Sequence, residues 1–257
     1  MVESTLTMGL GMKLAPSLNV QQELIQHIEE KLNTIDEIFR SHYEDDQKII
    51  SGVVEIYMNA NPNLNREVME KALAFAQKHH LGQYRDSGVP YAVHPAQTGY
   101  ILAEWGLSNN AVVTGDLHDV EEENEEKKIL LMNEIYTNFG VEVLIAVNAL
   151  SGFIKDPELR DKDISRKMRE YQELLKIDYI NHVKVAENIT NQLTRKYMFP
   201  KNDQTSEQRQ QNFIKNSRRY VLPLAEEIDR TEQIKMRLDD KLIPFLIAPY
   251  LMELMDK

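Results

Sequence analysis

Apolar side chains recur at helical spacing along this chain, and that spacing constrains the fold more than any other feature. The stretch 18–40, LNVQQELIQHIEEKLNTIDEIFR, has apolar residues at positions 25, 28, 32, 35 and 39. A spacing near 3.5 residues places these side chains on one face of a helix. The stripe predicts either a short coiled-coil-like seam, and hence a homodimer through the N-terminal helices, or a helix docked on its own domain.

Further helices are predicted along the rest of the chain. Residues 47–60 form one that ends at Asn-Pro-Asn, and Asn65 is the expected cap of the next helix, REVMEKALAFAQKHH. Other helices are expected over about 96–105, from Asn109 or Asn110 as cap through 120, and over 127–138, 141–150, 164–197 and 207–235. The polar stretch SGFIKDPELRDKDI is expected to be a loop. Because no segment shows sustained strand alternation, the sequence predicts an all-α fold.

Composition limits the chemistry open to the chain. The 257 residues include no cysteine, so any metal must be held by histidine, carboxylate or carbonyl ligands. The net charge of −11 gives no general attraction to nucleic acid or to anionic lipid. No signal peptide is recognised and no window reaches 18 uncharged apolar residues, so a cytoplasmic protein without a membrane span is expected. An acidic chain that handles a phosphorylated ligand needs local basic groups or a bound cation.

The stretch LHDVEEENEE, residues 117–126, places His118 beside Asp119 and follows them with glutamates. Neighbouring helical residues point about 100° apart, so each can give one ligand but other helices must complete a metal site. His94 precedes a proline and is therefore expected in a turn. Glu187 and Asn191, four residues apart, share one face of a later helix. Two histidines and two carboxylates suit a divalent cation such as Mn²⁺; the alternative is a solvated acidic helix end.

The stretch HLGQYRDSGVPYAVHP resembles the entry motif of the HD-domain hydrolases of the RelA/SpoT type, H-x-G-Q-x-R-x-S-G-x-P-Y-x-x-H-P. The stretch HDVEEEN, which begins 24 residues after His94, resembles the second motif of that family, H-D-V-V-E-D-T. SRKM, VKVAENITN and YVLPLAEEI are similar to later family segments, and the resemblance covers roughly residues 66–230.

The resemblance implies roles for eleven residues. The implied ligands of one Mn²⁺ per chain are His94, His118, Asp119 and Glu187. The implied catalytic carboxylates, which orient the attacking water, are Glu122 and Glu123. The implied substrate-binding residues are Arg85, Ser87, Tyr91, Asn191 and Thr194.

The implied fold is an HD-domain helical bundle over 65–235, with an N-terminal helical extension over 1–64 and a helical tail over 236–257 packed on the domain. The implied reaction removes the 3′-pyrophosphate of the alarmone ppGpp or pppGpp, giving GDP or GTP. Only about 27 residues follow residue 230, so the small stand-alone alarmone hydrolases are the closer expectation. The alternatives are hydrolysis of another phosphorylated nucleotide, and a regulatory module that has lost turnover.

Several positions depart from the family pattern. Glu187 stands where the family has the shorter aspartate, which affects the metal site directly. Asp86, Asn188 and Leu193 stand where the family has basic residues. Basic side chains make the strong charge-assisted hydrogen bonds to phosphate. These three positions are the reason for considering another nucleotide as substrate.

Overall fold

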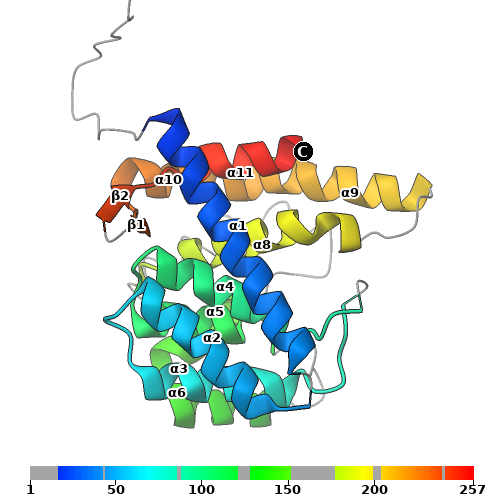
Figure 1. Cartoon of the computed structure of the whole chain (residues 1–257). Helices are drawn as coiled ribbons and strands as arrows, with labels where there is room; N and C mark the ends of the chain where they lie inside the picture. Colours follow the sequence, from blue (N-terminus) through cyan, green and yellow to red (C-terminus); the bar gives the residue numbers. More distant parts are fainter. Residues whose placement is uncertain are drawn as a thin grey trace, which may run out of the picture.

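The computed structural model describes residues 17–42, 44–85, 88–120, 128–151, 177–198, 204–238 and 241–257. Nearly all regular structure in these ranges is helical, which confirms the all-α class (Figure 1). The helices are α1 (Leu18–Ser41), α2 (Asp46–Ala60), α3 (Arg66–His79), α4 (Val93–Glu104), α5 (Asn109–Leu117), α6 (Lys128–Ser151), α8 (Ile180–Met198), α9 (Gln204–Asn216), the π-helix η2 (Ser217–Val221), α10 (Leu222–Thr231) and α11 (Ile247–Asp256). Two short strands, β1 (Lys235–Leu238) and β2 (Lys241–Pro244), form an antiparallel pair.

Helix α1 docks on its own chain. In Figure 1, helices α2 to α6 form the lower part of the molecule, α8 to α11 form the upper part, and α1 crosses both. The five apolar positions of the predicted stripe, 25, 28, 32, 35 and 39, are all buried inside the chain. The Gln21 side chain also donates a 2.8 Å hydrogen bond to the Leu246 carbonyl, just before α11. The stripe is therefore a docking face within one chain, and it is not available as a dimer seam.

The helix starts combine one confirmed prediction with two corrections. Asn65 caps α3, its side chain accepting from the Val68 amide at 3.2 Å. Ser108, rather than Asn109 or Asn110, caps α5, because the Asn109 side chain accepts instead from the backbone of residue 65. The prediction of a turn at His94 is wrong, because α4 begins at Val93 and takes the following proline into its first turn. Amides in a first turn have no partner within the helix, so a proline is tolerated there.

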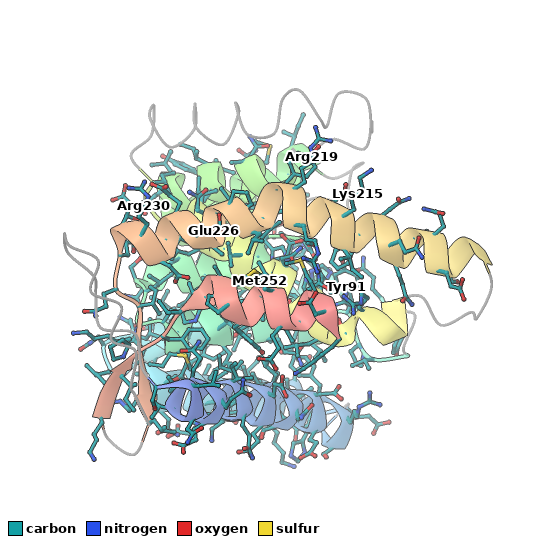
Figure 2. All side chains as sticks on the ribbon, turned by 90° about the horizontal axis from the view of Figure 1, so that it is seen from above. Tyr91, Lys215, Arg219, Glu226, Arg230 and Met252 are labelled. Carbon is teal, nitrogen blue, oxygen red and sulfur yellow. The ribbon has the colours of Figure 1, made fainter. Side chains whose placement is uncertain are left out.

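The C-terminal part departs from the predicted helical tail. Figure 2 shows α9, η2 and α10 as one long helical run, with Lys215, Arg219 and Arg230 along it and α11 beside it. After α10 the chain forms the β1–β2 pair, in which Met236 lies opposite Ile243, and only then the helix α11. The helical prediction for 236–257 is therefore wrong for the strands and right for α11. Each strand has four residues, too few for an alternating pattern to be recognised.

Helix α6 joins the two predicted helices 127–138 and 141–150. The backbone at Gly140 is not helical, with φ of 87°, and it marks the junction. Ile129–Leu150 is long and apolar enough to cross a membrane by length and composition, a test that core helices of globular proteins also pass. Its Glu134 carboxylate lies 3.0 Å from Lys78 Nζ, which ties α6 to α3. The predicted loop after residue 151 and the start of the predicted helix 164–197 lie outside the described residues.

Helices α4 and α5 approach each other closely because glycines face each other at their crossing. A Cβ built on Gly115 would lie 3.3 Å from backbone atoms of Gly99 and 2.5 Å from Leu102 Cδ1. A Cβ built on Gly99 would lie 2.2 Å from Asp116 Oδ1 and 2.5 Å from Tyr57 Oη. No ordinary side chain fits in either place, so these two glycines set the distance between the helices.

A buried polar pair occupies this crossing. The Tyr57 hydroxyl donates to the Ala96 carbonyl at 2.6 Å, and its oxygen lies 2.7 Å from Asp116 Oδ1. Burial raises the pKa of the Asp116 carboxyl well above its ordinary value. A hydroxyl has one proton to donate, so a protonated Asp116 can donate to the tyrosine oxygen while the tyrosine donates to the carbonyl. The pair then joins α2, α4 and α5 without a buried charge.

We predict that Gly99→Ala lowers the free energy of unfolding by at least about 2 kcal/mol, because the new methyl group displaces two hydrogen-bonded buried groups. Urea denaturation measures the change. Gly52→Ala is the matched control, since its Cβ would meet only the flexible Ile38 side chain, at 3.3 Å. Its unfolding free energy should stay within about 1 kcal/mol of the wild type. Equal stability of the two variants would contradict the close approach of α4 and α5.

Candidate metal centre and substrate cavity

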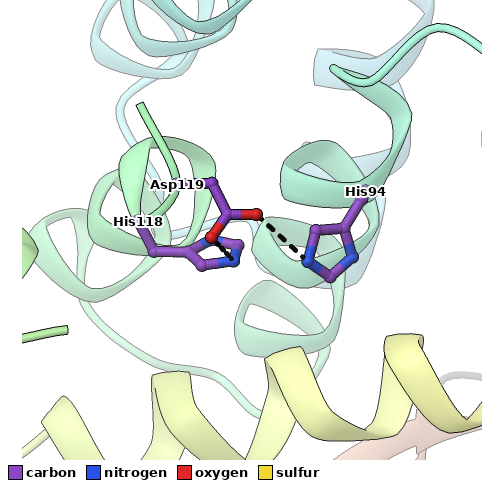
Figure 3. Close-up of side chains that lie close together, drawn as sticks. All are labelled: His94, His118 and Asp119. Carbon is purple, nitrogen blue, oxygen red and sulfur yellow. Dashed lines mark ion pairs between the residues drawn. The ribbon is translucent and has the colours of Figure 1, made fainter. Parts of the chain in front are cut away.

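Three of the predicted ligands converge. His94 comes from the first turn of α4, His118 caps the C-terminus of α5, and Asp119 follows it in the chain; the three side chains point toward one another (Figure 3). Asp119 Oδ2 lies 3.5 Å from His94 Nε2, and Oδ1 lies 3.1 Å from His118 Nε2. One ligand atom from each residue falls within 4.8 Å of the others. The close crossing of α4 and α5 makes this convergence possible.

Hydrogen bonds at the Nδ1 atoms of both histidines fix the tautomer that binds a metal through Nε2. The Thr190 hydroxyl donates to the Glu187 carbonyl at 2.8 Å, so its oxygen can accept from His94 Nδ1, which lies 3.0 Å away. His118 Nδ1 lies 2.7 Å from the Gly115 carbonyl oxygen and must donate to it. Both Nδ1 atoms therefore carry protons, and both Nε2 atoms face Asp119. This arrangement of outer partners is typical of histidine ligands.

The contact between His118 and Asp119 fits a cation. His118 Nε2 is buried and lies 3.1 Å from Asp119 Oδ1 without a hydrogen bond of good geometry. A lone pair and a carboxylate oxygen repel each other at this distance unless a proton or a metal ion lies between them. Burial by itself would lower the pKa of His118, but the Asp119 carboxylate raises that pKa to about 9. A proton thus occupies this position near neutral pH when no metal does, and a divalent cation would replace it.

The other two ligands already have the charge states that a metal prefers. Burial, together with the charge of Arg85, holds the pKa of His94 well below its usual value, so His94 is neutral. Burial would raise the pKa of Asp119, but the adjacent His118 holds it well below the ordinary range of a carboxyl group. A neutral imidazole and an ionised carboxylate are the forms that bind metal.

The fourth predicted ligand lies nearby but has other partners. Glu187 Oε2 accepts from Lys184 Nζ at 2.7 Å, and Oε1 accepts from Asn191 Nδ2 at 3.4 Å. The three-residue group described above does not include Glu187. Metal ligation by Glu187 remains a prediction. The predicted catalytic residues Glu122 and Glu123, and the predicted substrate-binding Ser87, lie outside the described residues.

Predicted substrate-binding residues lie beside the metal group. The Tyr91 hydroxyl donates to Asp119 Oδ2 at 3.0 Å. Arg85 Nη2 donates to Asn191 Oδ1 at 2.9 Å, and its guanidinium lies 5.9 Å from the centre of the Tyr91 ring. The Thr194 hydroxyl donates to the Thr190 carbonyl, one turn back along α8. The structure therefore brings Asn191 of α8 to Arg85 and Tyr91 of the loop before α4, although about 100 residues separate α8 from that loop.

Two further residues position this group and were not identified from the sequence. Thr190 holds His94, as described above, and its only sequence signal is its place three residues after Glu187 on the same helix face. His80 stacks on the Tyr91 ring at 4.8 Å between centres, and its Nδ1 lies 2.7 Å from Gln83 Oε1. His80 belongs to the entry motif, so its presence there was the available signal.

A cavity of about 640 Å³ reaches the metal group at His94. Arg85, Thr190, Thr194 and Arg195 line it on one side, and residues of α1 and α11 line it on the other. The volume falls within the range of small-molecule sites. A ligand of nucleotide size can therefore lie against His94, between the domain that carries the metal group and the two terminal helices.

We predict that Thr190→Val lowers the affinity for Mn²⁺ by roughly 10- to 100-fold, because His94 loses the acceptor that fixes its tautomer. Titration calorimetry of the metal-free protein with Mn²⁺ measures the change. Thr34→Val is the matched control, since the Thr34 hydroxyl donates to the Glu30 carbonyl within α1, outside the metal group. Equal Mn²⁺ affinity of Thr190→Val and the wild type would show that the hydrogen bond does not support the metal site.

Comparisons with known proteins identify a family and several relatives that are similar to this chain. Residues 72–178 match the family described as HD domain. The guanosine-3′,5′-bis(diphosphate) 3′-pyrophosphohydrolase of Borreliella burgdorferi is 32% identical over 183 residues, which are 68% of this chain and 25% of that protein. The protein of the same description from Spiroplasma citri is 29% identical over 155 residues, or 59% of this chain and 20% of its own.

A GTP pyrophosphokinase of Myxococcus xanthus is also similar, with 27% identity over 180 residues, or 70% of this chain and 23% of that protein. The chain thus spans a quarter or less of the length of these curated relatives. The matched region contains both histidines and the aspartate of the metal group. The chain therefore contains an HD domain and is a homologue of the (p)ppGpp hydrolases and synthetases of the RelA/SpoT type.

Proposed function

We propose that this chain hydrolyses the 3′-pyrophosphate of ppGpp or pppGpp, giving GDP or GTP and pyrophosphate, in the cytoplasm. The observation that carries the proposal is the convergence of His94, His118 and Asp119, together with a cavity of nucleotide size that is lined by His94. Two relatives described as 3′-pyrophosphohydrolases support the choice of reaction. We assign Mn²⁺ as the ion, one per chain, with Glu187 as its fourth ligand.

The residues around the ion have separate tasks in this reaction. A divalent cation held here would polarise a phosphoryl oxygen and acidify a water molecule. Tyr91 holds the Asp119 carboxylate in place through its hydroxyl. Arg85, tied to Asn191, presents its guanidinium to the cavity beside His94, where it can bind an oxygen of the nucleotide or stack on its base. Glu122 and Glu123 are proposed to orient the attacking water and to accept its proton.

One observation favours a second candidate, an HD module that binds a nucleotide without turning it over. The Glu187 carboxylate is paired with Lys184 at 2.7 Å and stands outside the three-residue metal group. With this pair in place, three of the described residues are left to hold the metal. Release of pyrophosphate from ppGpp, measured with Mn²⁺ and with chelator, separates the two candidates.

The outcomes of that measurement are distinct. Release that requires Mn²⁺ supports the hydrolase. A protein that binds Mn²⁺ but leaves ppGpp intact would indicate another phosphorylated nucleotide as substrate, which a panel of nucleotides would identify. A protein that binds no Mn²⁺ would indicate the module without turnover.

We predict that Asp119→Asn reduces Mn²⁺-dependent hydrolysis to the background, because the amide cannot supply the anionic ligand shared between the two histidines. Circular dichroism should show unchanged helix content. Asp256→Asn is the matched control, because Asp256 is exposed on α11 and pairs with Arg218. Wild-type turnover by Asp119→Asn would contradict the ligand assignment.

We predict that Glu187→Asp keeps or raises the activity, because it restores the ligand length found in the family. The shorter side chain should also weaken the pair with Lys184. The measurement is kcat at saturating Mn²⁺ together with the dissociation constant for Mn²⁺. A large loss of both activity and Mn²⁺ affinity would show that the site is built around glutamate.

A further inference from the structure

Helix α8 lines the cavity from Thr190, which contacts His94, as far as Arg195. Glu187, Asn191 and Arg195 follow one another at intervals of four residues and therefore lie on one face of the helix. With a rise of about 1.5 Å per residue, Arg195 lies roughly 12 Å along the axis from Glu187. Arg195 lines the cavity that reaches His94. The cavity thus meets the metal group at His94 and has the Arg195 guanidinium farther along α8.

Among the described residues, the guanidinium of Arg195 has neutral partners. Its Nη1 donates to Gln192 Oε1 at 2.5 Å and makes a longer contact of 3.5 Å with the Leu254 carbonyl oxygen. Within the described part of the chain, no carboxylate lies within ion-pair distance of it. Burial lowers its pKa from the ordinary value. A partly buried cation without a counter-ion is unfavourable, and an anionic ligand would relieve that cost.

Two other cationic side chains that line the cavity each pair with a carboxylate. Arg40 of α1 pairs with Asp36 at 2.9 Å, and Lys257 pairs with Glu253 at 2.9 Å. Their charges are already matched within the chain. Arg195 is therefore the better candidate to contact an anion that enters the cavity.

We propose that Arg195 binds a second phosphoryl group of the substrate, at its 5′ end, while the 3′-pyrophosphate lies at the metal group. This inference rests on the proposed function. A guanosine nucleotide phosphorylated on both the 3′ and the 5′ oxygen carries anionic groups on opposite sides of one ribose. A metal group and an unmatched guanidinium at separate places along one cavity suit such a ligand.

The chain lacks basic residues at three positions where the family has them. Asn188 stands at one of them, and its side chain donates to Ser217 Oγ at 3.0 Å, where it is buried between α8 and η2. It is therefore directed into the packing between helices. Arg195 restores a cation to α8 two turns farther along, within the cavity.

The test is equilibrium binding in the presence of Mn²⁺, measured by rapid filtration at low temperature, with chromatography of the bound nucleotide to check that it is intact. Wild type, Arg195→Gln and Arg195→Lys are each titrated with ppGpp and with guanosine 3′-diphosphate, which has no 5′ phosphoryl group. Arg66→Gln is the matched control, because Arg66 pairs with Glu55 at 2.8 Å on the surface, outside the cavity lining. Thermal melting of each variant checks that it is folded.

We predict that Arg195→Gln weakens ppGpp binding by roughly 10- to 100-fold and leaves guanosine 3′-diphosphate binding unchanged. Arg195→Lys, which keeps the charge, should recover much of the lost affinity. Equal losses for both nucleotides, or no loss for ppGpp, would overturn the inference, and so would a wild type that binds neither nucleotide. A wild type that binds ppGpp in this pattern but releases no pyrophosphate with Mn²⁺ would contradict only the proposed hydrolysis.

Discussion

The close crossing of α4 and α5 is the constraint on which the rest of the site depends. Gly99 and Gly115 allow the two backbones to approach within a distance that any side chain would prevent. The approach places His94 of α4 opposite His118 and Asp119 at the end of α5. The buried Tyr57–Asp116 pair fills the same crossing, and it avoids a buried charge because burial raises the pKa of Asp116. The contact between α4 and α5 therefore determines both the packing of these helices and the geometry of the metal group.

Helix α8 extends this centre into a binding site. Thr190 reaches His94 from α8 and fixes its tautomer, while Asn191 holds Arg85 from the loop before α4. Residues of α1 and α11 line the other side of the cavity, although they lie at opposite ends of the described chain. An acidic protein with a net charge of −11 thus gathers a metal group and arginines around one cavity. This local reversal of charge is what a phosphorylated ligand requires.

Much of this arrangement followed from local patterns. Residue types and spacing were enough to predict an all-α fold and the Asn65 cap, and the resemblance to the HD-domain hydrolases added His94, His118 and Asp119 as metal ligands. Other features depended on partners that periodicity does not show. Ser108 caps α5 because Asn109 is occupied by the backbone of residue 65, and two four-residue strands are too short to show alternation. The prediction of a turn at His94 was wrong because a first helical turn tolerates the following proline.

The sequence by itself determined that the chain is mainly helical and offered His94, His118 and Asp119 as candidate metal ligands, because helical periodicity and ligand chemistry can be read from the residues themselves. Only the tertiary structure decided that the stripe of α1 docks within its own chain and that Thr190 of α8 holds His94. Only the tertiary structure, too, placed Arg195 in the cavity with neutral partners. These outcomes depend on which side chains from distant segments compete for the same space and the same charges, and that competition is settled only when the helices pack.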